Sequence, residues 1–547
     1  MARFHAEYVT HDEDLISLSS VEQDICGYIA QDQQDDYERW IAQDQRWKVF
    51  YHLTRMRKSL LNWYRFVEGA TLLEIDGGFG ALTGLYCDRC KEVVSIERFL
   101  HRAEQIYERH KTRNNLTVYA GRIDDIPLEP SFDYITLIGS LEFRGEGKAD
   151  RKIYADYLRK AKRFLKPDGK LLIAVENRFG LRYFCGTLDP HTGVPFAGIN
   201  GYPQGSAGRS FSKQELIDII RQAGFRHYKF YYPLPDYKLP QVIFSDEYIP
   251  PYCVKERVFP YYHNSSTLVA VERELYADII ENEVFDFFAN SFLVECFDEG
   301  EVSDVMFAAL STDRGREEAF ATTIHQDGTV RKKPLWPEGK FRLEAILRHH
   351  QELQARGLRV VDSRIDHDEL VMPHIAANKL SEYLKMIVRR EPDRYIQLFD
   401  QLYACILESS EHVSSVNDSL LFFDRHADYG VILAKAYTDM VPVNCFYDLG
   451  SFIFFDQEFV MERYPAKYVL YRALKYTYLF DQSAEEVVPL ESLKQKYGLT
   501  NLLWEVFEKV ERMFVSANRK YDENRSFFAK TYVNLDRIYE NARYLMR

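Results

Sequence analysis

A glycine-rich turn and a carboxylate about 20 residues later form the first set of residues that could do chemistry. The segment from Glu74 to Gly80 reads Glu-Ile-Asp-Gly-Gly-Phe-Gly and ends a short apolar run. Gly78 and Gly80 let the backbone approach a ligand where a side chain would collide. Glu97 ends the next apolar run, and a carboxylate there can accept hydrogen bonds from both hydroxyls of a ribose. The spacing predicts a nucleoside-cofactor site, with a tightly packed structural turn as the alternative.

Three residues in the carboxyl-terminal half form a second set. Asp439 and Asn444 make an Asp-x4-Asn motif, and Asp456 follows after a strand-like run. Phosphoryl transfer needs a carboxylate that orients or deprotonates the attacking hydroxyl. It also needs an amide and a carboxylate that hold Mg²⁺ against nucleotide phosphates. Asp439 is predicted for the first role, and Asn444 and Asp456 are predicted for the second.

A polar loop after the apolar run 170–175 forms a third set. It begins with Glu176, Asn177 and Arg178, and it is rich in arginine, histidine and aromatic residues. Loops at the carboxyl ends of parallel strands bind substrates, and this composition favours an anionic or sugar-containing acceptor. His191 is the candidate general base because imidazole titrates near neutral pH. The alternative is that His191 only caps a turn.

The elements that must position these residues alternate between strand and helix. Strands alternating with helices predict a parallel sheet with right-handed crossovers. A hairpin-like pair at 228–232 and 266–271 is expected to complete this sheet. The five expected parallel strands are residues 71–75, 92–96, 116–119, 134–138 and 170–175.

The pattern changes near residue 275 to a helical connector and then to a smaller β-rich part followed by mostly helical sequence. Short strands are expected at 291–296, 305–310, 319–325 and 329–333. The predicted organisation is an acidic extension (1–46) that is loosely ordered or helical, an α/β domain (47–274), an α+β domain (275–489) and a helical segment (490–547).

The first half resembles class I S-adenosylmethionine-dependent methyltransferases over residues 47–272. Glu74, Gly78 and Gly80 match the family's first motif, and Glu97 matches its ribose-binding acid. The resemblance implies that Asp124 contacts the adenine, although it can equally cap a turn. One departure is Asp76, which replaces the first glycine of the motif. The acceptor loop resembles an insertion in methyltransferases of bacterial surface-polysaccharide assembly, which implies a substrate-binding role for Glu176, Asn177 and Arg178.

The second half resembles protein-kinase-like and aminoglycoside-phosphotransferase-like enzymes over residues 288–480. The resemblance implies that Lys332 or Lys333 contacts nucleotide phosphate and pairs with Glu344 on the following helix. The expected glycine-rich loop is reduced to residues 297–300, with one glycine. Fewer glycines weaken phosphate binding, so a catalytically inactive kinase fold remains an alternative.

The two domains in this order resemble the WbdD-type bifunctional kinase–methyltransferases that cap bacterial O-antigen chains. The expected fold is therefore a Rossmann-like methyltransferase sheet followed by a two-lobed kinase-like domain. The resemblance implies S-adenosylmethionine, ATP and Mg²⁺ as cofactors and a glycan or sugar phosphate as the acceptor. The alternative function is a non-catalytic scaffold whose pseudokinase domain holds glycosyltransferase partners.

Composition limits these possibilities. The net charge of −13 disfavours a broad nucleic-acid surface, and residues 1–46 hold 11 acidic residues against three basic ones. Eight dilute cysteines favour a reducing compartment over a disulfide scaffold. We find neither a secretory signal nor an apolar run that could span a bilayer. The expected location is the cytoplasm, with attachment to the membrane through partners.

Overall fold

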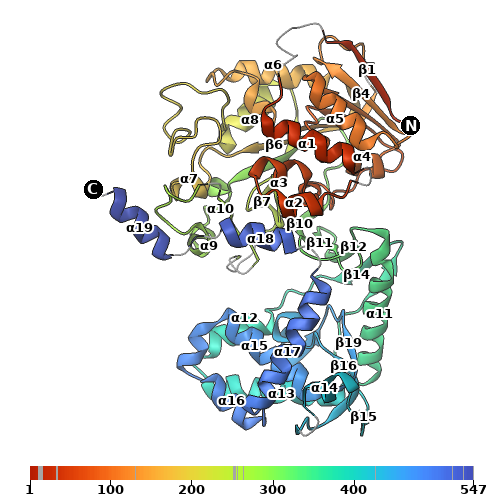
Figure 1. Cartoon of the computed structure of the whole chain (residues 1–547), viewed down its shortest axis with the longest axis vertical. Coiled ribbons are helices and arrows are strands. Elements are labelled where there is room, and N and C mark those ends of the chain that lie inside the picture. Colours follow the sequence, from red (N-terminus) through yellow and green to blue (C-terminus); the bar gives the residue numbers. More distant parts are fainter. Residues whose placement is uncertain are drawn as a thin grey trace. The chain divides into compact units, whose positions relative to one another are not determined.

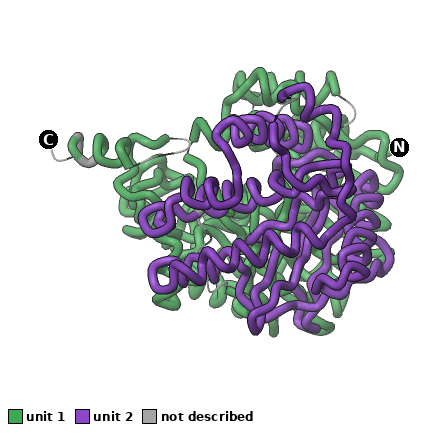
Figure 2. The backbone as a smooth tube through the Cα atoms, turned by 90° about the horizontal axis from the view of Figure 1, so that it is seen from below, with its two compact units in different colours: residues 1–312, 521–547 green, residues 313–520 purple. Residues whose placement is uncertain are grey.

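The computed structural model forms two compact units (Figure 2). Unit 1 contains residues 1–312 and 521–547, and unit 2 contains residues 313–520. In the described part of the chain, no helix has the length and apolar character needed to cross a membrane. The structure describes residues 1–9, 17–32, 35–129, 131–249, 254, 257–262, 264–424, 427–519, 522–531, 533 and 535–545.

Five parallel strands form the centre of unit 1, in the order β4-β3-β2-β5-β6. Their apolar side chains are almost completely buried because helices cover a parallel sheet on both faces. All five strands predicted from the sequence are confirmed. They are β2 (Thr71–Ile75), β3 (Glu92–Glu97), β4 (Leu116–Gly121), β5 (Phe132–Ile138) and β6 (Leu165–Glu176).

An antiparallel strand, β9 (Ser291–Phe297), extends this sheet beyond β6. It pairs with β6 on one side and with β7 (His227–Leu234) on the other. Next to β7 lie β8 (Val242–Ser245) and β10 (Val305–Leu310). The expected hairpin partner of β7 at 266–271 was wrong, because those residues form turns and loops.

The position of β9 also explains why unit 1 extends to residue 312 instead of ending near residue 275. The sequence predicts β9 as a strand but does not say which sheet it joins. Seven residue pairs join β9 to β6, so the segment predicted to begin the second domain belongs to the first sheet. The single-glycine loop at 297–300 consequently lies in unit 1.

The described parts of the acidic amino-terminal segment belong to the unit 1 fold. β1 (Arg3–Tyr8) pairs in parallel with β4 at the edge of the sheet (Figure 1). Ile25 and Ile29 of α1 (Ser20–Gln31) are buried in one apolar cluster with Val49 and Phe50. The expectation of a loosely ordered or helical extension was therefore wrong for β1 and incomplete for the helices, which pack on the domain.

Most of the other helices of unit 1 lie in the connections between successive strands of the chain. α8 shows how sequence defines such a helix: the Ser212 hydroxyl accepts from Glu215 N at 3.2 Å, and the Glu215 carboxylate accepts from Ser212 N at 2.8 Å. These helices are α2 (Glu38–Gln43), α3 (Trp47–Leu53), η2 (Arg55–Leu60), α4 (Thr83–Arg89), α5 (Leu100–His110), η3 (Leu141–Phe143), α6 (Arg151–Lys162), α7 (Leu181–Phe184), α8 (Lys213–Gln222), α9 (Glu272–Glu281) and α10 (Phe285–Phe288).

Unit 2 has a small sheet followed by a larger helical part. Its sheet has the antiparallel order β11-β12-β14-β13 and packs on the long helix α11 (Lys340–Ala355). The strands are β11 (Phe320–His325), β12 (Thr329–Pro334), β13 (Arg364–Asp366) and β14 (Glu369–Pro373).

The helical part of unit 2 has its own apolar core, to which two short strand groups also contribute. Its helices are α12 (Leu380–Ile387), α13 (Pro392–Glu408), α14 (Asp418–Phe423), α15 (Ala466–Phe480), η6 (Gln482–Glu486), α16 (Leu490–Lys496) and α17 (Asn501–Asn518). Its strands and connecting turn are β15 (His412–Val413), β16 (Ile432–Tyr437), η5 (Pro442–Asn444), β17 (Cys445–Asp448), β18 (Ser451–Phe454) and β19 (Val460–Pro465).

The last predicted segment, residues 490–547, is divided between the two units. Val506, Phe507 and Val510 of α17 are buried in the core of unit 2. The final helices, α18 (Asp522–Thr531) and α19 (Leu535–Leu545), belong to unit 1. There the ring of Phe527 stacks on Phe50 with 4.0 Å between centroids.

Candidate functional site

The glycine turn lies directly after β2 and has an unusual backbone. Asp76, Gly78 and Gly80 all have positive φ, at 59°, 61° and 73°. A Cβ added to Gly78 would meet no atom within 4 Å, so this glycine faces open space. The turn therefore keeps its backbone uncovered where a ligand can approach it.

Two buried carboxylates from neighbouring strands hold this turn. Glu97 ends β3, and its two oxygens accept hydrogen bonds from Gly78 N at 2.8 Å and Phe99 N at 3.1 Å. Glu74 in β2 accepts from the hydroxyls of Thr83 at 2.6 Å and Ser95 at 2.7 Å. Burial raises the pKa of Glu74 to about 7. The structure thus brings together Glu74, Gly78 and Glu97 as the sequence predicts.

Helix α5 fixes the other side of the turn through backbone carbonyls. Arg109 donates to Phe79 O at 3.0 Å, and His110 Nε2 donates to Gly80 O at 2.8 Å. Burial lowers the pKa of His110 to about 4, so its ring is neutral near pH 7. A neutral ring with Nε2 protonated is the form that can donate to a carbonyl.

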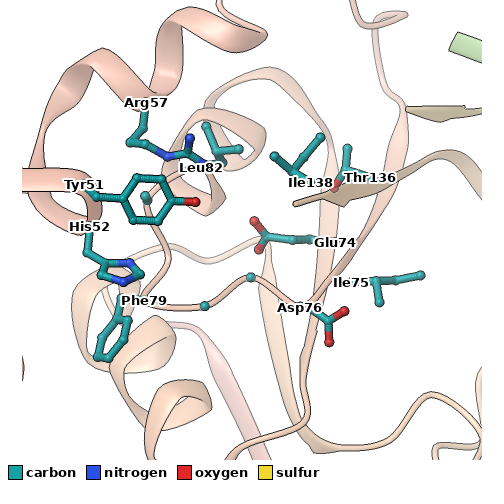
Figure 3. A pocket seen from close by; sticks show the side chains of 13 residues that line it. Tyr51, His52, Arg57, Glu74, Ile75, Asp76, Phe79, Leu82, Thr136 and Ile138 are labelled. Carbon is teal, nitrogen blue, oxygen red and sulfur yellow. The ribbon is translucent and has the colours of Figure 1, made fainter. Parts of the chain in front are cut away.

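A pocket opens on this turn (Figure 3). Glu74, Asp76 and Gly78 form one wall, and Thr136 and Ile138 from the end of β5 contribute to another. The sequence analysis missed the facing side chains, which come from α3 and η2. They are Tyr51, His52 and Arg57. A tyrosine, a histidine and an arginine close together in the sequence were the only available signal, and their spacing matches no motif.

Asp76, the departure from the family motif, forms an ion pair with Arg144. Arg144 follows η3, and its guanidinium lies 4.4 Å from the ring centroid of Tyr157. The Asp76 carboxylate is therefore already partnered by a cation. Asp76 connects the glycine turn to the loop after β5.

Asp124 is exposed, and its carboxylate pairs with Lys160 of α6 at 2.7 Å. It does not line the pocket beside Gly78. The geometry therefore brings Glu74 and Glu97 to the turn but leaves the predicted adenine contact of Asp124 as a prediction.

The three residues predicted for acceptor binding occupy different environments. Glu176 is 1% exposed, accepts from the Tyr183 hydroxyl at 3.0 Å and contacts Lys238. Asn177 donates to the carbonyls of Phe287 and Ala289. Arg178 pairs with Glu215 at 2.9 Å, so Asn177 and Arg178 stabilise the loop in this structure.

His191 lies in the loop after α7. Its backbone N donates to Asp189 Oδ1 at 3.0 Å, and its Nε2 lies 3.2 Å from the Ser210 hydroxyl. Its buried Nδ1 has no hydrogen-bond partner among the described residues. The imidazole does not cap the turn, since the cap comes from Asp189. Its role as a base stays a prediction.

In unit 2, Lys332 of β12 is buried and contacts Asp456 and Glu458. Lys333 points to a different partner, with Nζ 3.9 Å from Glu369. Glu344 on α11 is exposed. The expected pairing of a lysine with Glu344 was wrong, because the Lys332 ammonium pairs with the carboxylates of Asp456 and Glu458 instead.

The other predicted residues of this half also lie close together. Asn444 Nδ2 donates to Asp439 O at 3.4 Å, and Phe455 N donates to Asn444 O at 3.0 Å. Asp439 is 9% exposed, and Arg472 pairs with it at 3.2 Å. Asp456 has a positive φ of 57°, a conformation that non-glycine residues adopt mainly at constrained sites. Lys332, Asp439, Asn444 and Asp456 therefore converge.

Within the described ranges, no group of three or more histidine, cysteine, aspartate or glutamate side chains is arranged so that it could hold a metal ion. Asn444 and Asp456 offer two hard oxygen ligands. Mg²⁺ in nucleotide sites commonly takes one or two carboxylates and completes its shell with phosphate and water. The residues present are compatible with such a shared site.

Comparison with known proteins identifies a domain within unit 1. Residues 73–173 match the family model for a methyltransferase domain, and these residues carry the turn, Glu74, Gly78 and Glu97. Unit 1 thus contains a methyltransferase domain. The comparison with curated proteins finds no match.

Solved structures also resemble the chain. A SAM-dependent methyltransferase from Thermotoga maritima is 17% identical, with a TM-score of 0.28, over 48% of this chain and 98% of that one. The YcgJ protein from Bacillus subtilis is 16% identical, with a TM-score of 0.25, over 45% and 99%. Phosphoethanolamine N-methyltransferase 1 from Haemonchus contortus, solved with S-adenosylhomocysteine, is 12% identical, with a TM-score of 0.29, over 51% and 50%.

Proposed function

We propose that unit 1 binds S-adenosylmethionine in the pocket beside Gly78 and directs methyl transfer to an acceptor. The observation that carries the proposal is the joint position of Glu97 and the open glycine turn, held by the 2.8 Å bond from Gly78 N. Glu97 would bind the ribose, and Glu74 would face the cationic end of the cofactor. When bound, S-adenosylmethionine supplies an activated methyl group. The chain's own task is to orient it and to manage the acceptor's proton.

We propose a glycan or sugar phosphate as the acceptor, within bacterial surface-polysaccharide synthesis and with glycosyltransferases as partners. Support comes from the loop after β6, which leads from Glu176 to His191 at the carboxyl edge of the sheet. Phe143 beside this loop is 54% exposed, and its ring lies 5.2 Å from that of His191. An exposed aromatic ring beside polar groups suits a sugar, which has both apolar faces and hydroxyls.

Gly78→Ala is expected to abolish most cofactor binding while leaving the fold intact. The added methyl group meets no protein atom within 4 Å but projects into the open space where the ligand would lie. Gly69→Ala is a matched control, because Gly69 also has positive φ (75°) and open surroundings but lies outside the pocket. Each change should cost about 1 kcal/mol of stability. Calorimetry with S-adenosylmethionine measures the difference, and a folded wild-type protein that fails to bind would overturn the function.

Cofactor affinity is expected to rise with pH between about 6 and 8. The pKa of Glu74 lies near 7, and a cationic ligand favours its charged form. Below that pKa, binding must displace a proton, so affinity should fall by up to about tenfold per pH unit. Glu74→Gln should be weaker at pH 8 and nearly independent of pH. An unchanged pH dependence in that variant would assign the proton to another group.

We also propose that unit 2 binds Mg-ATP and transfers phosphate to the sugar. The favouring observation is that Lys332 contacts Asp456 although 124 residues separate them. Asp439 would orient the hydroxyl, Asn444 and Asp456 would hold Mg²⁺, and Lys332 would contact phosphate. The single-glycine loop lies in unit 1, which keeps the non-catalytic scaffold as the alternative.

Asp456→Asn is expected to remove stabilisation by Mg-ATP. A ligand at 100 times its Kd stabilises the native state by about 2.7 kcal/mol, and loss of the metal-binding carboxylate should remove most of this. Asp448→Asn changes a partly exposed aspartate in β17 and should leave the shift intact. A thermal-shift titration measures both. Wild-type protein with no response to Mg-ATP would favour the scaffold.

A further inference from the structure

Three charged side chains converge where β5, β6 and β7 end in unit 1. Glu142 lies in η3 after β5, Glu176 is the last residue of β6, and Lys238 follows β7. Glu176 N donates to Glu142 Oε1 at 2.6 Å, and Lys238 Nζ contacts Glu176 Oε1. The carboxyl ends of parallel strands are where substrates reach an α/β sheet. This cluster lies on the acceptor side of the fold.

The two carboxylates of the cluster are buried, and they outnumber the ammonium groups. Glu142 and Glu176 are 2% and 1% exposed, and within the described structure Lys238, whose side chain is 19% exposed, is the one ammonium that pairs with Glu176. Burying charge is costly unless it is paired, so proton positions in such a group are sensitive to their surroundings. A structural ion pair alone would not require the second carboxylate.

The cofactor pocket and the cluster share a wall. Arg57 lines the pocket, and its Nη1 donates to Lys238 O at 2.8 Å. Tyr237 packs on the end of β5, since a Cβ at Gly139 would lie 2.5 Å from the Tyr237 hydroxyl. The neighbouring Ile138 lines the pocket. Lys238 thus contacts both Arg57, which lines the pocket, and Glu176, where the loop that carries His191 begins.

We propose that Lys238, in place of the His191 predicted from the sequence, is the catalytic base that receives the acceptor's proton, with Glu142 and Glu176 as its positioning residues. The proposal rests on the methyltransferase function proposed above. The lone pair of Nζ takes the proton of an acceptor hydroxyl, and the freed electron pair on oxygen forms the new bond to the methyl carbon. The old carbon–sulfur bonding pair stays on the sulfur of the departing product. The Lys238 ammonium then returns its proton to solvent.

The surroundings of Lys238 suit this role. Burial lowers the pKa of Lys238 to about 8, while Glu142 raises it and Arg57 lowers it. The facing groups are Glu176 from β6, Glu142 from η3, Arg57 from η2 and the adjacent Tyr237 ring, whose centroid is 4.8 Å from Nζ. A measurable fraction of Lys238 is then neutral at pH 7 to 8, which a base requires.

Competitive labelling with acetic anhydride across pH 6 to 11, with mass spectrometry of each lysine, tests the proposal without an acceptor. Lys148, which is exposed, is the internal reference. Lys238 should titrate about two pH units below the ordinary range of a lysine side chain. At fixed pH, the neutral fraction of Lys238 should be about three- to tenfold larger with saturating S-adenosylmethionine than with saturating S-adenosylhomocysteine. The reason is that only S-adenosylmethionine carries the sulfonium charge.

Variants of Glu142 and Glu176 test whether these carboxylates control the pKa of Lys238 or only pack beside it. Glu142→Gln and Glu176→Gln should each lower the apparent pKa of Lys238 further, because each removes a carboxylate that favours its charged form. Glu247→Gln, which removes the partner of Lys229 elsewhere in unit 1, should leave Lys238 unchanged.

Two results would overturn the base assignment: titration of Lys238 together with Lys148, or equal labelling with the two cofactors. Calorimetry on the same sample distinguishes failure of the Lys238 assignment from failure of the methyltransferase function. Protein that binds neither cofactor contradicts the methyltransferase function, and the proposal for Lys238 with it. Ordinary titration of Lys238 in protein that binds S-adenosylmethionine contradicts only the role of Lys238.

Discussion

Glu97→Gln is expected to weaken binding of S-adenosylmethionine about 10- to 100-fold. The wild-type carboxylate accepts from Gly78 N and Phe99 N, which fixes both the turn and the orientation of the side chain. Hydrogen bonds to a charged group contribute about 1.5–3 kcal/mol, roughly twice a neutral bond. Glutamine keeps the shape, but its amide group has only one acceptor oxygen. It therefore cannot serve both backbone donors and a ribose.

Glu92→Gln is the matched control for this measurement. Glu92 begins the same strand, and its side chain is 51% exposed at the opposite end of β3. Calorimetry should find its affinity within about twofold of wild type, since exposed ion pairs contribute little. Urea unfolding of both variants checks that the fold is retained. If Glu97→Gln binds as tightly as Glu92→Gln, the ribose assignment of Glu97 is wrong.

The centre of the unit 1 sheet could be predicted because its signals are local. Each parallel strand is a short apolar run, and the glycine turn follows the first run directly, as at Ile75 to Gly80. Glu74 pairs with Ser95 in the parallel register of β2 and β3, so Glu97 lies two residues further toward the carboxyl end of the sheet. In a parallel sheet, knowing which strands are neighbours is enough to bring their carboxyl ends together.

The edges of the sheet could not be predicted, because pairing between distant strands leaves no local signal. The apolar sequence of β9 predicts a strand, but it does not distinguish pairing with β6 from the start of another sheet. The pairing of β1 with β4 joins residues more than 100 positions apart, as for Arg3 and Thr117. Such contacts depend on which edge is available in the folded chain.

The residues that line the pocket could also be predicted only in part from the sequence. Tyr51, His52 and Arg57 reach the pocket because α3 and η2 pack beside the glycine turn, and no motif spacing encodes that packing. In unit 2, the sequence indicated Lys332, Asp439, Asn444 and Asp456 but gave the wrong partner for Lys332. Glu458, two residues after Asp456, takes the place expected for Glu344. A helix face can be predicted from periodicity, whereas its neighbour across the core cannot.

The structure gives the acidic amino-terminal segment a role that its composition did not indicate. Asp35 pairs with Arg109 and with Lys58, each at 2.6 Å. Arg109 also donates to the carbonyls of Phe79 and His52, both of which belong to pocket residues. One carboxylate from residues 1–46 therefore positions the arginine that holds the glycine turn.

Asp35→Asn is expected to destabilise unit 1 by about 3–5 kcal/mol, because the Arg109 side chain, only 2% exposed, would lose its anion. The two cations keep the pKa of Asp35 far below its ordinary value. A depressed carboxyl pKa gives stability that is present above the unfolded-state pKa near 4 and is lost as pH falls through the folded-state pKa. The deficit of the variant should therefore be largest at pH 5 and above, and should shrink in strong acid.

Asp24→Asn in the same segment is the control, because Asp24 and its partner Arg46 are both more than 40% exposed and their pair should contribute less than about 1 kcal/mol. Urea midpoints at pH 7, together with hydrogen exchange of α5 amides, compare the two variants. Faster exchange in α5 and weaker binding of S-adenosylmethionine should accompany Asp35→Asn alone. Equal behaviour of the two variants would mean that the acidic segment packs on unit 1 without supporting the cofactor turn.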